Sequence, residues 1–213
     1  MASFPTIPEP PSLCPADRRW LGAIALDALE SSLRTAPSPQ RTTLEPSIQA
    51  AELVVGLFVT IYHGAELRGC LGLAVPKDPL PVALPRLVAA SASRDTRFSP
   101  VEAAELPELR LEITLLGPLI PLLLDPIAIL QGLSPLRHGA QVKLGESNGI
   151  LLPQVARRYG WDAAELLRQV SRKAGLPPAA WREPGAQVSA FQARSYAVRR
   201  DGTAEADLFQ GGL

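Results

Sequence analysis

The stretch that decides the fold reads LVVGLFVTI over residues 53–61 and LRGCLG over residues 67–72. The first run is rich in the apolar and β-branched residues that favour strands, and the loop from Tyr62 to Ala65 contains a glycine. Two such runs separated by a short loop with a glycine are typical of a hairpin. We therefore predict strands over about 53–61 and 66–74, paired antiparallel.

The rest of the chain mixes further strands with helices. Apolar and polar residues alternate most clearly from Leu109 to Leu115, which predicts a strand with one face in the core. A hairpin is predicted over 140–152 and a last strand over 187–198. Helical spacing and capping residues predict helices over about 16–33, 84–93, 126–131, 153–160 and 162–174. Hairpins mixed with helices, without a regular strand–helix–strand repeat, indicate an α+β fold with a mixed, largely antiparallel sheet and packed helices.

The composition indicates a folded protein without an excess of charge. The 213 residues include 21 Lys and Arg against 21 Asp and Glu, so the formal net charge is zero. A basic surface for nucleic acid is therefore not expected. The length suits one large domain, which we place at residues 15–198, between a flexible Pro-rich N-terminus at 1–14 and a flexible tail at 199–213.

Cysteine usage and the N-terminal sequence predict a cytoplasmic location. Cys14 and Cys70 are the only cysteines and form no close pair, which argues against a disulfide framework and a zinc ribbon. The first residues lack the basic and apolar segments of a secretory signal. The apolar stretch 113–136 is interrupted by four prolines, so we expect no membrane span.

Cys70 is the candidate reactive residue, because it lies in a glycine-rich segment two positions after an arginine. Side chains alternate faces along a strand, so Arg68 and Cys70 would project to the same side. A neighbouring guanidinium favours the thiolate, which is the nucleophilic and metal-binding form of cysteine. Gly69 and Gly72 would leave room for another backbone or for a ligand. The alternative is that Cys70 is a small core residue without a chemical role.

Two further groups of residues could contribute to a site. His138 lies just before a predicted strand, where a loop could present it as the base of a Cys70–His138 pair. His63 is expected in a hairpin turn, exposed to solvent. Arg97 could bind an anionic substrate with Asp95 orienting it, or the two could form an internal salt bridge that fixes their loop.

The sequence contains no signature of a cofactor. The motifs GxGxxG and HExxH and the P-loop are absent, so dinucleotide binding, nucleotide hydrolysis and zincin chemistry lack their usual signals. A metal would need a mixed site drawn from Cys70, His63, His138 and carboxylates, because the histidines and cysteines show none of the usual ligand spacings. We therefore expect no cofactor and no metal.

Several short motifs occur in one order along the chain: Phe58-Val59-Thr60, Leu67-Arg68-Gly69-Cys70-Leu71-Gly72, Asp95-x-Arg97-Phe98-x-Pro100, Glu105-Leu106-Pro107, His138-Gly139, Leu152-Pro153-Gln154-Val155 and Lys173-Ala174-Gly175-Leu176. Taken together they resemble the AMMECR domain family, whose bacterial and archaeal members include AmmeMemoRadiSam system protein A. The resemblance covers about residues 16–198. It implies an α+β protein with two interlocked lobes around a cleft, and it places the Arg-Gly-Cys segment among the signature positions. It implies no reaction, but the system name makes a Memo-like protein and a radical-SAM protein the expected partners.

Two functions are open for this chain. The first is a binding or adaptor component of a multi-protein system, in which partner proteins supply the activity. The second is an enzyme in which Cys70 acts as nucleophile or ligand, and Arg68 and Arg97 bind a small anionic substrate while Asp95 orients Arg97. We favour the first, because no complete set of nucleophile, base and orienting residue can be identified in the sequence.

Overall fold

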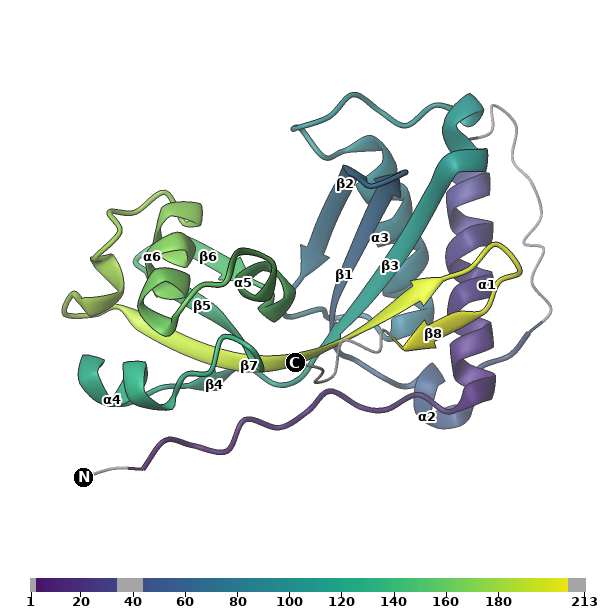
Figure 1. Ribbon diagram of the computed structural model, residues 1–213. Helices are drawn as coiled ribbons and strands as arrows, with labels where there is room; N and C mark the ends of the chain where they lie inside the picture. The colour runs from purple at the N-terminus through teal and green to yellow at the C-terminus, as the bar shows by residue number, and fades with distance from the viewer. Residues whose placement is uncertain (1–2, 34–43, 207–213) are drawn as a thin grey trace. The chain divides into compact units, whose positions relative to one another are not determined.

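The computed structural model describes residues 3–33 and 44–206 (Figure 1). The chain divides into two compact units, each built from two separate stretches. The unit that contains His138 comprises Met1–Pro10 and Leu116–Ala193, and the unit that contains Cys70 comprises Pro11–Leu115 and Arg194–Leu213. We call them the His138 unit and the Cys70 unit.

The Cys70 unit is built on a sheet. Its strands follow the order β2 (Glu66–Leu73), β1 (Gly56–His63), β3 (Leu109–Leu116) and the second half of β7 (Gln187–Val198), which also pairs with β8 (Ala204–Ala206). The β1–β2 and β7–β8 pairs are antiparallel. Among the described strands β2 is the edge of this sheet, so one side of its backbone has no strand beside it.

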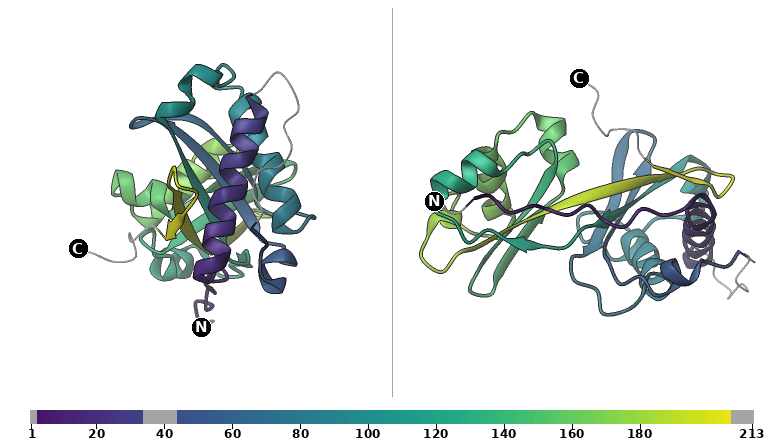
Figure 2. Two further views of the ribbon diagram at one scale, coloured as in Figure 1. Left: turned by 90° about the vertical axis from the view of Figure 1, so that its right-hand side faces the viewer. Right: turned by 90° about the horizontal axis from the view of Figure 1, so that it is seen from below.

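Alternation along the strands explains how the helices attach. Leu57, Val59 and Ile61 of β1 point to one face of the sheet and are fully buried. Figures 1 and 2 show α1 (Pro15–Ser32) and α3 (Leu80–Ser93) on one face of this sheet. The apolar residues of both helices belong to the same core as these strand residues. Two short elements, α2 (Ile48–Ala51) and the 3₁₀ turn η1 (Ala103–Glu108), complete the unit.

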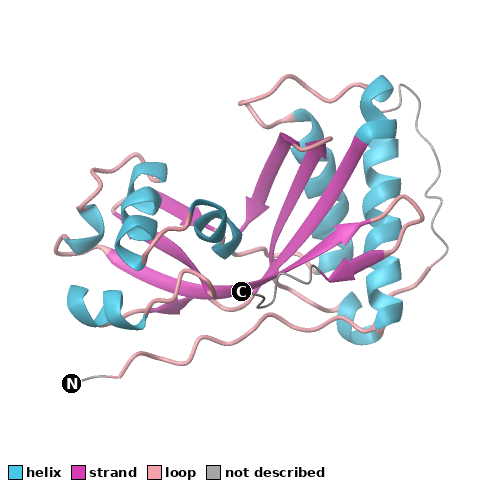
Figure 3. Ribbon diagram, viewed as in Figure 1, coloured by secondary structure: helices cyan, strands magenta, loops and turns pink. Residues whose placement is uncertain are grey.

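The His138 unit combines a second sheet with short helices (Figure 3). Strand β5 (His138–Leu144) pairs antiparallel with β6 (Ser147–Leu151) and with the first half of β7, and β4 (Ile120–Pro121) pairs with β7 on its other side. The helices are α4 (Pro126–Gly132), α5 (Pro153–Tyr159), α6 (Ala163–Lys173) and the 3₁₀ turn η2 (Ala180–Arg182). Apolar residues of α6 are fully buried in the core of this unit.

The predicted α+β class and the antiparallel hairpins are confirmed. The predicted strands and helices are present, and the last strand has the predicted limits, Gln187–Val198. Strand β1 begins at Gly56 rather than Leu53 and ends at His63, which was predicted to lie in the turn. Helix α3 begins at Leu80, earlier than predicted, because Pro81 lies in the first turn, where a missing N–H costs no helical hydrogen bond. The structure adds α2, β4, β8, η1 and η2, which are too short for a periodic pattern to reveal.

The two ends of the chain, for which we predicted flexibility, are described in part. Residues 3–14 contain no helix or strand, yet Ile7 and Leu13 are buried. Strand β8 lies within the segment 199–213, while residues 1–2 and 207–213 lie outside the described residues. Within the described ranges, no helix is both long enough and apolar enough to cross a bilayer.

Candidate functional site

Cys70 lies within the edge strand β2, on the sheet face opposite α1 and α3. Its cross-strand partner on β1 is Thr60, and the Thr60 Oγ1 and Cys70 Sγ atoms are 3.3 Å apart. Residues directly opposite each other in an antiparallel pair share a face, which explains the contact. The Cys70 side chain is half-buried and forms no disulfide. The thiol therefore contacts a hydroxyl and remains in part accessible to solvent.

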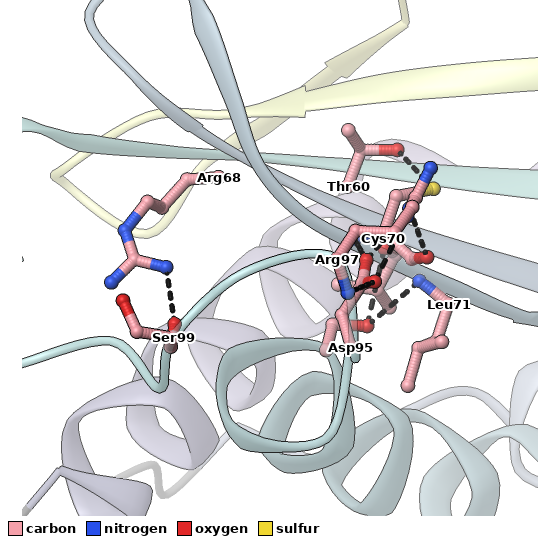
Figure 4. Close-up of polar contacts among 9 residues, drawn as sticks. Thr60, Arg68, Cys70, Leu71, Asp95, Arg97 and Ser99 are labelled. Carbon is pink, nitrogen blue, oxygen red and sulfur yellow. Dashed lines mark hydrogen bonds and ion pairs between the residues drawn. The ribbon is translucent and has the colours of Figure 1, made fainter.

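Side chains from α3 and from the loop after it bond the backbone of β2. Cys70 donates its backbone N–H to Asp95 Oδ2 at 2.8 Å, and Arg97 Nη2 donates to the Cys70 carbonyl oxygen at 3.1 Å (Figure 4). The hydroxyl of Ser91 accepts from the backbone N–H of Leu71 at 3.3 Å. Ser91 also donates to the carbonyl oxygen of Val59 at 3.2 Å, so it bridges β2 and β1. Asp95 and Arg97 take the place of a neighbouring strand on the outer edge, and they bring a carboxylate and a guanidinium beside Cys70.

Asp95 and Arg97 form a two-point ion pair. Arg97 Nε lies 2.9 Å from Asp95 Oδ1, and Arg97 Nη2 lies 2.7 Å from Asp95 Oδ2. Only 5% of the Asp95 side chain is exposed. The hydrogen bonds from Arg97, with a smaller contribution from the Cys70 N–H, lower the pKa of Asp95 from 3.8 to about 2. Asp95 is therefore charged at neutral pH and is too weak a base to take a proton from a thiol.

Arg97 is held on one side and exposed on the other. Its hydrogen bonds to Asp95 raise the pKa of Arg97, and the side chain of Cys70 acts in the same direction. The guanidinium carbon also lies 5.4 Å from the centre of the Phe98 ring. Despite these contacts 56% of the Arg97 side chain is exposed. The arrangement presents a positive charge of fixed orientation next to the thiol.

Arg68 is engaged in a different set of contacts. Its guanidinium pairs with Glu105, with an Nε–Oε1 distance of 2.7 Å and an Nη2–Oε2 distance of 2.9 Å. It also donates to the carbonyl oxygens of Ser99 and Pro100, and Figure 4 shows it directed toward Ser99. Arg68 thus ties β2 to the segment before β3. The guanidinium that interacts with the Cys70 side chain is that of Arg97.

The space beside the two predicted glycines is filled by the protein itself. A Cβ atom on Gly69 would lie 2.2 Å from the carbonyl oxygen of Ser91, so glycine is needed for α3 to approach β2. A Cβ atom on Gly72 would lie 2.2 Å from the Phe58 ring. We expected Gly69 and Gly72 to leave room either for another backbone or for a ligand. At Gly69 the structure shows the close approach of another backbone.

His138 belongs to the other unit, where it is the first residue of β5 rather than part of a loop. Its Nδ1 accepts a hydrogen bond from the backbone N–H of Ser134 at 3.2 Å, and its ring stacks on Phe4 with 5.9 Å between the ring centres. Burial, together with the charge of Arg137, lowers the pKa of His138. These contacts lie within the His138 unit, and the Cys70–His138 pair stays a prediction.

His63, the other histidine, lies beside a carboxylate. It ends β1, with its Nε2 atom 3.4 Å from Glu108 Oε2. In the described ranges, no group of three or more His, Cys, Asp and Glu side chains could hold a metal ion.

Three residues near Cys70 have contacts that sequence reasoning missed, although Thr60 and Glu105 occur in the motifs quoted above. The contact of Thr60 could have been predicted from the hairpin register, whereas Ser91 and Glu105 make contacts that no local sequence pattern predicts.

Residues 145–149 have the spacing GxSxG, which sequence reasoning also missed. That motif needs a strand-to-helix turn to expose its serine, but here it forms the turn between β5 and β6 and the start of β6. It is therefore not a nucleophile elbow.

Comparison with known proteins identifies the family of the chain. A sequence model of the AMMECR1 family matches residues 22–196. A protein of Methanothermobacter thermautotrophicus is 36% identical over 179 residues, which cover 84% of this chain and 92% of the relative. Protein MJ0810 of Methanocaldococcus jannaschii is 37% identical over 146 residues, which cover 66% of this chain and 72% of the relative.

A solved structure agrees with this assignment. The crystal structure of the uncharacterized protein PH0010 from Pyrococcus horikoshii is similar to this chain with a TM-score of 0.82 and 29% sequence identity. The similarity covers 92% of this chain and 98% of that one. Sequence motifs, fold and matched length agree, and the chain belongs to the AMMECR1 family.

Proposed function

We propose that this chain is a binding component that recognises an anionic group of its ligand or partner through Arg97, beside Cys70. The observation that carries the proposal is the state of Arg97, whose guanidinium is fixed by two bonds to Asp95 while 56% of its side chain is exposed. A guanidinium that is already oriented binds a carboxylate or phosphate with a smaller loss of conformational entropy. The Thr60 hydroxyl and the Cys70 thiol supply further polar contacts beside it.

We propose that the partners are a Memo-like protein and a radical-SAM protein. We also propose that the chain binds them in the cytoplasm. Family membership supports this proposal, because the AmmeMemoRadiSam system joins the three kinds of protein by name. Two cysteines without a disulfide fit a reducing compartment. Sedimentation velocity of the purified proteins tests it. We expect a complex that the Arg97→Ala substitution weakens, and separate species at all concentrations would contradict the proposal.

Anion recognition is tested on the full chain with inorganic phosphate and acetate as probes. Binding is followed by the NMR signal of the Arg97 Nε–H group. We expect saturable binding that Arg97→Lys weakens about tenfold or more, since lysine keeps the charge but loses the two-point geometry. Arg86→Lys is the matched control, because Arg86 is another exposed arginine of this unit, 3.0 Å from Asp78. Equal binding by the Arg97→Lys and Arg86→Lys proteins would disprove the role of Arg97.

An enzyme that uses Cys70 as nucleophile or ligand is the second candidate function. The interaction between Arg97 and the Cys70 side chain supports it, because a nearby positive charge stabilises the thiolate. Asp95, with a pKa of about 2, does not qualify as the base. In this proposal Arg97 therefore favours the thiolate directly, and the substrate carries a negative charge that Arg97 also binds.

The pH dependence of Cys70 alkylation by iodoacetamide tests this candidate. The experiment uses a Cys14→Ser background, which keeps a side-chain acceptor at the N-cap of α1. We expect a midpoint below about 8.5 that rises by about one unit in Arg97→Ala. Arg86→Ala should leave the midpoint unchanged. If Arg97→Ala also leaves it unchanged, the charge does not activate the thiol and the enzyme hypothesis loses its support.

A further inference from the structure

A Pro-rich segment at the N-terminus packs on the His138 unit in a regular way. We call residues Phe4 to Pro10 the strap. It contains no helix or strand, and Figures 1 and 3 show it as an extended stretch of chain. Ile7 and Pro10 are buried and Phe4 and Pro5 are half-buried, whereas Thr6, Pro8 and Glu9 are exposed. The two buried residues are three positions apart, which fits a polyproline II segment with one face against a surface, because that helix has three residues per turn.

The aromatic end of the strap fits a site built for it. The Phe4 ring stacks on His138 with an angle of 16° between the ring planes. A Cβ atom on Gly132, the last residue of α4, would lie 2.0 Å from the Phe4 ring. Any larger residue at position 132 would therefore displace the ring. The His138 imidazole and Gly132, which has no side chain, together form a flat surface on which an aromatic ring packs.

The middle of the strap is recognised through both its side chain and its backbone. Ile7 is 5% exposed and belongs to the hydrophobic core of the His138 unit. Its carbonyl oxygen accepts a hydrogen bond of 2.6 Å from Nε2 of Gln192, on β7. A Cβ atom on Gly117 would lie 2.6 Å from the Pro8 carbonyl oxygen, so this glycine also admits the strap backbone. The His138 unit therefore contacts the middle of the strap through one buried side chain, one backbone hydrogen bond and one close backbone approach.

The receiving surface and the strap lie in different parts of the sequence. Gly117, Gly132, His138 and Gln192, which we call the strap site, all fall within residues 22–196. The strap precedes this range, so it lies outside the stretch that the family model matches. The strap site is therefore provided by the family domain, and the segment that fills it by the chain in front of that domain.

We infer that the strap site is a peptide-recognition site, filled in cis by the strap and able to take a Pro-rich segment of a partner protein. The partner segment would carry an aromatic residue followed by an aliphatic residue three positions later, as Phe4 and Ile7 are spaced. A tethered strap acts at an effective concentration in the millimolar range, so it holds the site closed until a better ligand arrives. A second copy of this chain is the weaker candidate, because exchange of identical straps creates no contact that is absent in the monomer.

Peptide binding to the full chain tests the inference. The probe is a fluorescent peptide with the sequence of residues 3–14 and serine in place of Cys14, followed by anisotropy. We expect the Phe4→Ala/Ile7→Ala protein, whose own strap is weakened, to bind it at least tenfold more tightly than the wild type does. A peptide with alanine in place of Phe4 and Ile7 is the matched control and should not bind. Adding Gln192→Ala to the double variant should weaken binding about tenfold, because one hydrogen bond to the peptide is lost.

Two results would overturn the inference. One is a folded double variant, checked by circular dichroism, that does not bind the peptide; if the double variant does not fold, Phe4→Ala alone serves, and the same absence of binding counts. The other is a wild-type protein that forms dimers by strap exchange, seen as a mass that doubles with concentration and returns to the monomer value in the double variant. That outcome would assign the site to a second copy of the chain.

Discussion

Asp95→Asn is the substitution that tests the electrostatics of the Cys70 site most directly. Asparagine has nearly the same shape, and its Oδ1 can still accept a hydrogen bond, but it is neutral and cannot form the charged pair with Arg97. The pKa of Asp95 is about 2 instead of 3.8, and each unit corresponds to about 1.4 kcal/mol. Only 5% of the Asp95 side chain is exposed, but solvent reaches Arg97, which is 56% exposed, and screens the pair in part. We therefore expect the free energy of unfolding of the Cys70 unit to fall by about 1–2 kcal/mol at pH 7.

The dependence of this loss on pH follows from the direction of the pKa shift. The pKa of Asp95 is lower in the folded state than in the unfolded state, so the folded state binds fewer protons between about 2 and 3.8. The stabilisation is fully present above pH 3.8 and is lost as the pH falls through about 2. The difference in stability between the wild type and Asp95→Asn should therefore be constant from neutral pH down to about pH 4, and nearly vanish below about pH 2.

The assay is urea unfolding followed by the fluorescence of Trp20. This residue is 2% exposed in the core of the Cys70 unit. Replacing Trp161 and Trp181 by phenylalanine in every protein leaves Trp20 as the only tryptophan. Asp78→Asn is the control, since the Asp78–Arg86 pair is exposed and should contribute less than about 1 kcal/mol. A loss in Asp95→Asn that is equally large at pH 7 and at pH 2 would show that charge is not its cause.

Two further predictions concern backbone approach and titration. Gly69→Ala should lower the stability of the Cys70 unit by about 2–3 kcal/mol, because the new methyl group meets the Ser91 carbonyl oxygen, which belongs to the helix backbone. Gly64→Ala has open space around it and should cost only about 1–2 kcal/mol for its φ of +60°; equal losses in urea unfolding would contradict the packing argument. For His138, whose pKa is lowered in the folded state, stability should be constant above about pH 6.5 and fall below it, because protonation removes the acceptor of the Ser134 N–H. His138→Asn keeps an acceptor and should abolish this fall between pH 7 and 5. The measurement uses the fluorescence of Trp161 and Trp181 in proteins that keep both residues, and an unchanged fall would assign it to another group.

The strand and helix pattern follows from the sequence because it depends on near neighbours. Alternation from Leu109 to Leu115, and the hairpin that pairs Thr60 with Cys70, are set by residues only a few positions apart or joined by one short turn. The position of Cys70 on a strand, opposite Thr60, could therefore be predicted from the sequence. The short elements could not be, since a strand such as Ile120–Pro121 has only two residues, too few for an alternation to repeat.

The sequence by itself determined the α+β class, the hairpin that carries Cys70 and the residue types that surround it. Only the tertiary structure decided which of them meet: Arg68 turns to Glu105, while Arg97, which is 27 positions from Cys70, binds its carbonyl oxygen. The same holds for the strap, where Ile7 meets Gln192 across 185 positions. Such contacts depend on how α3 packs against β2 and how the chain end packs against β7. No local periodicity encodes that packing, because it arises from the burial of many apolar side chains at once.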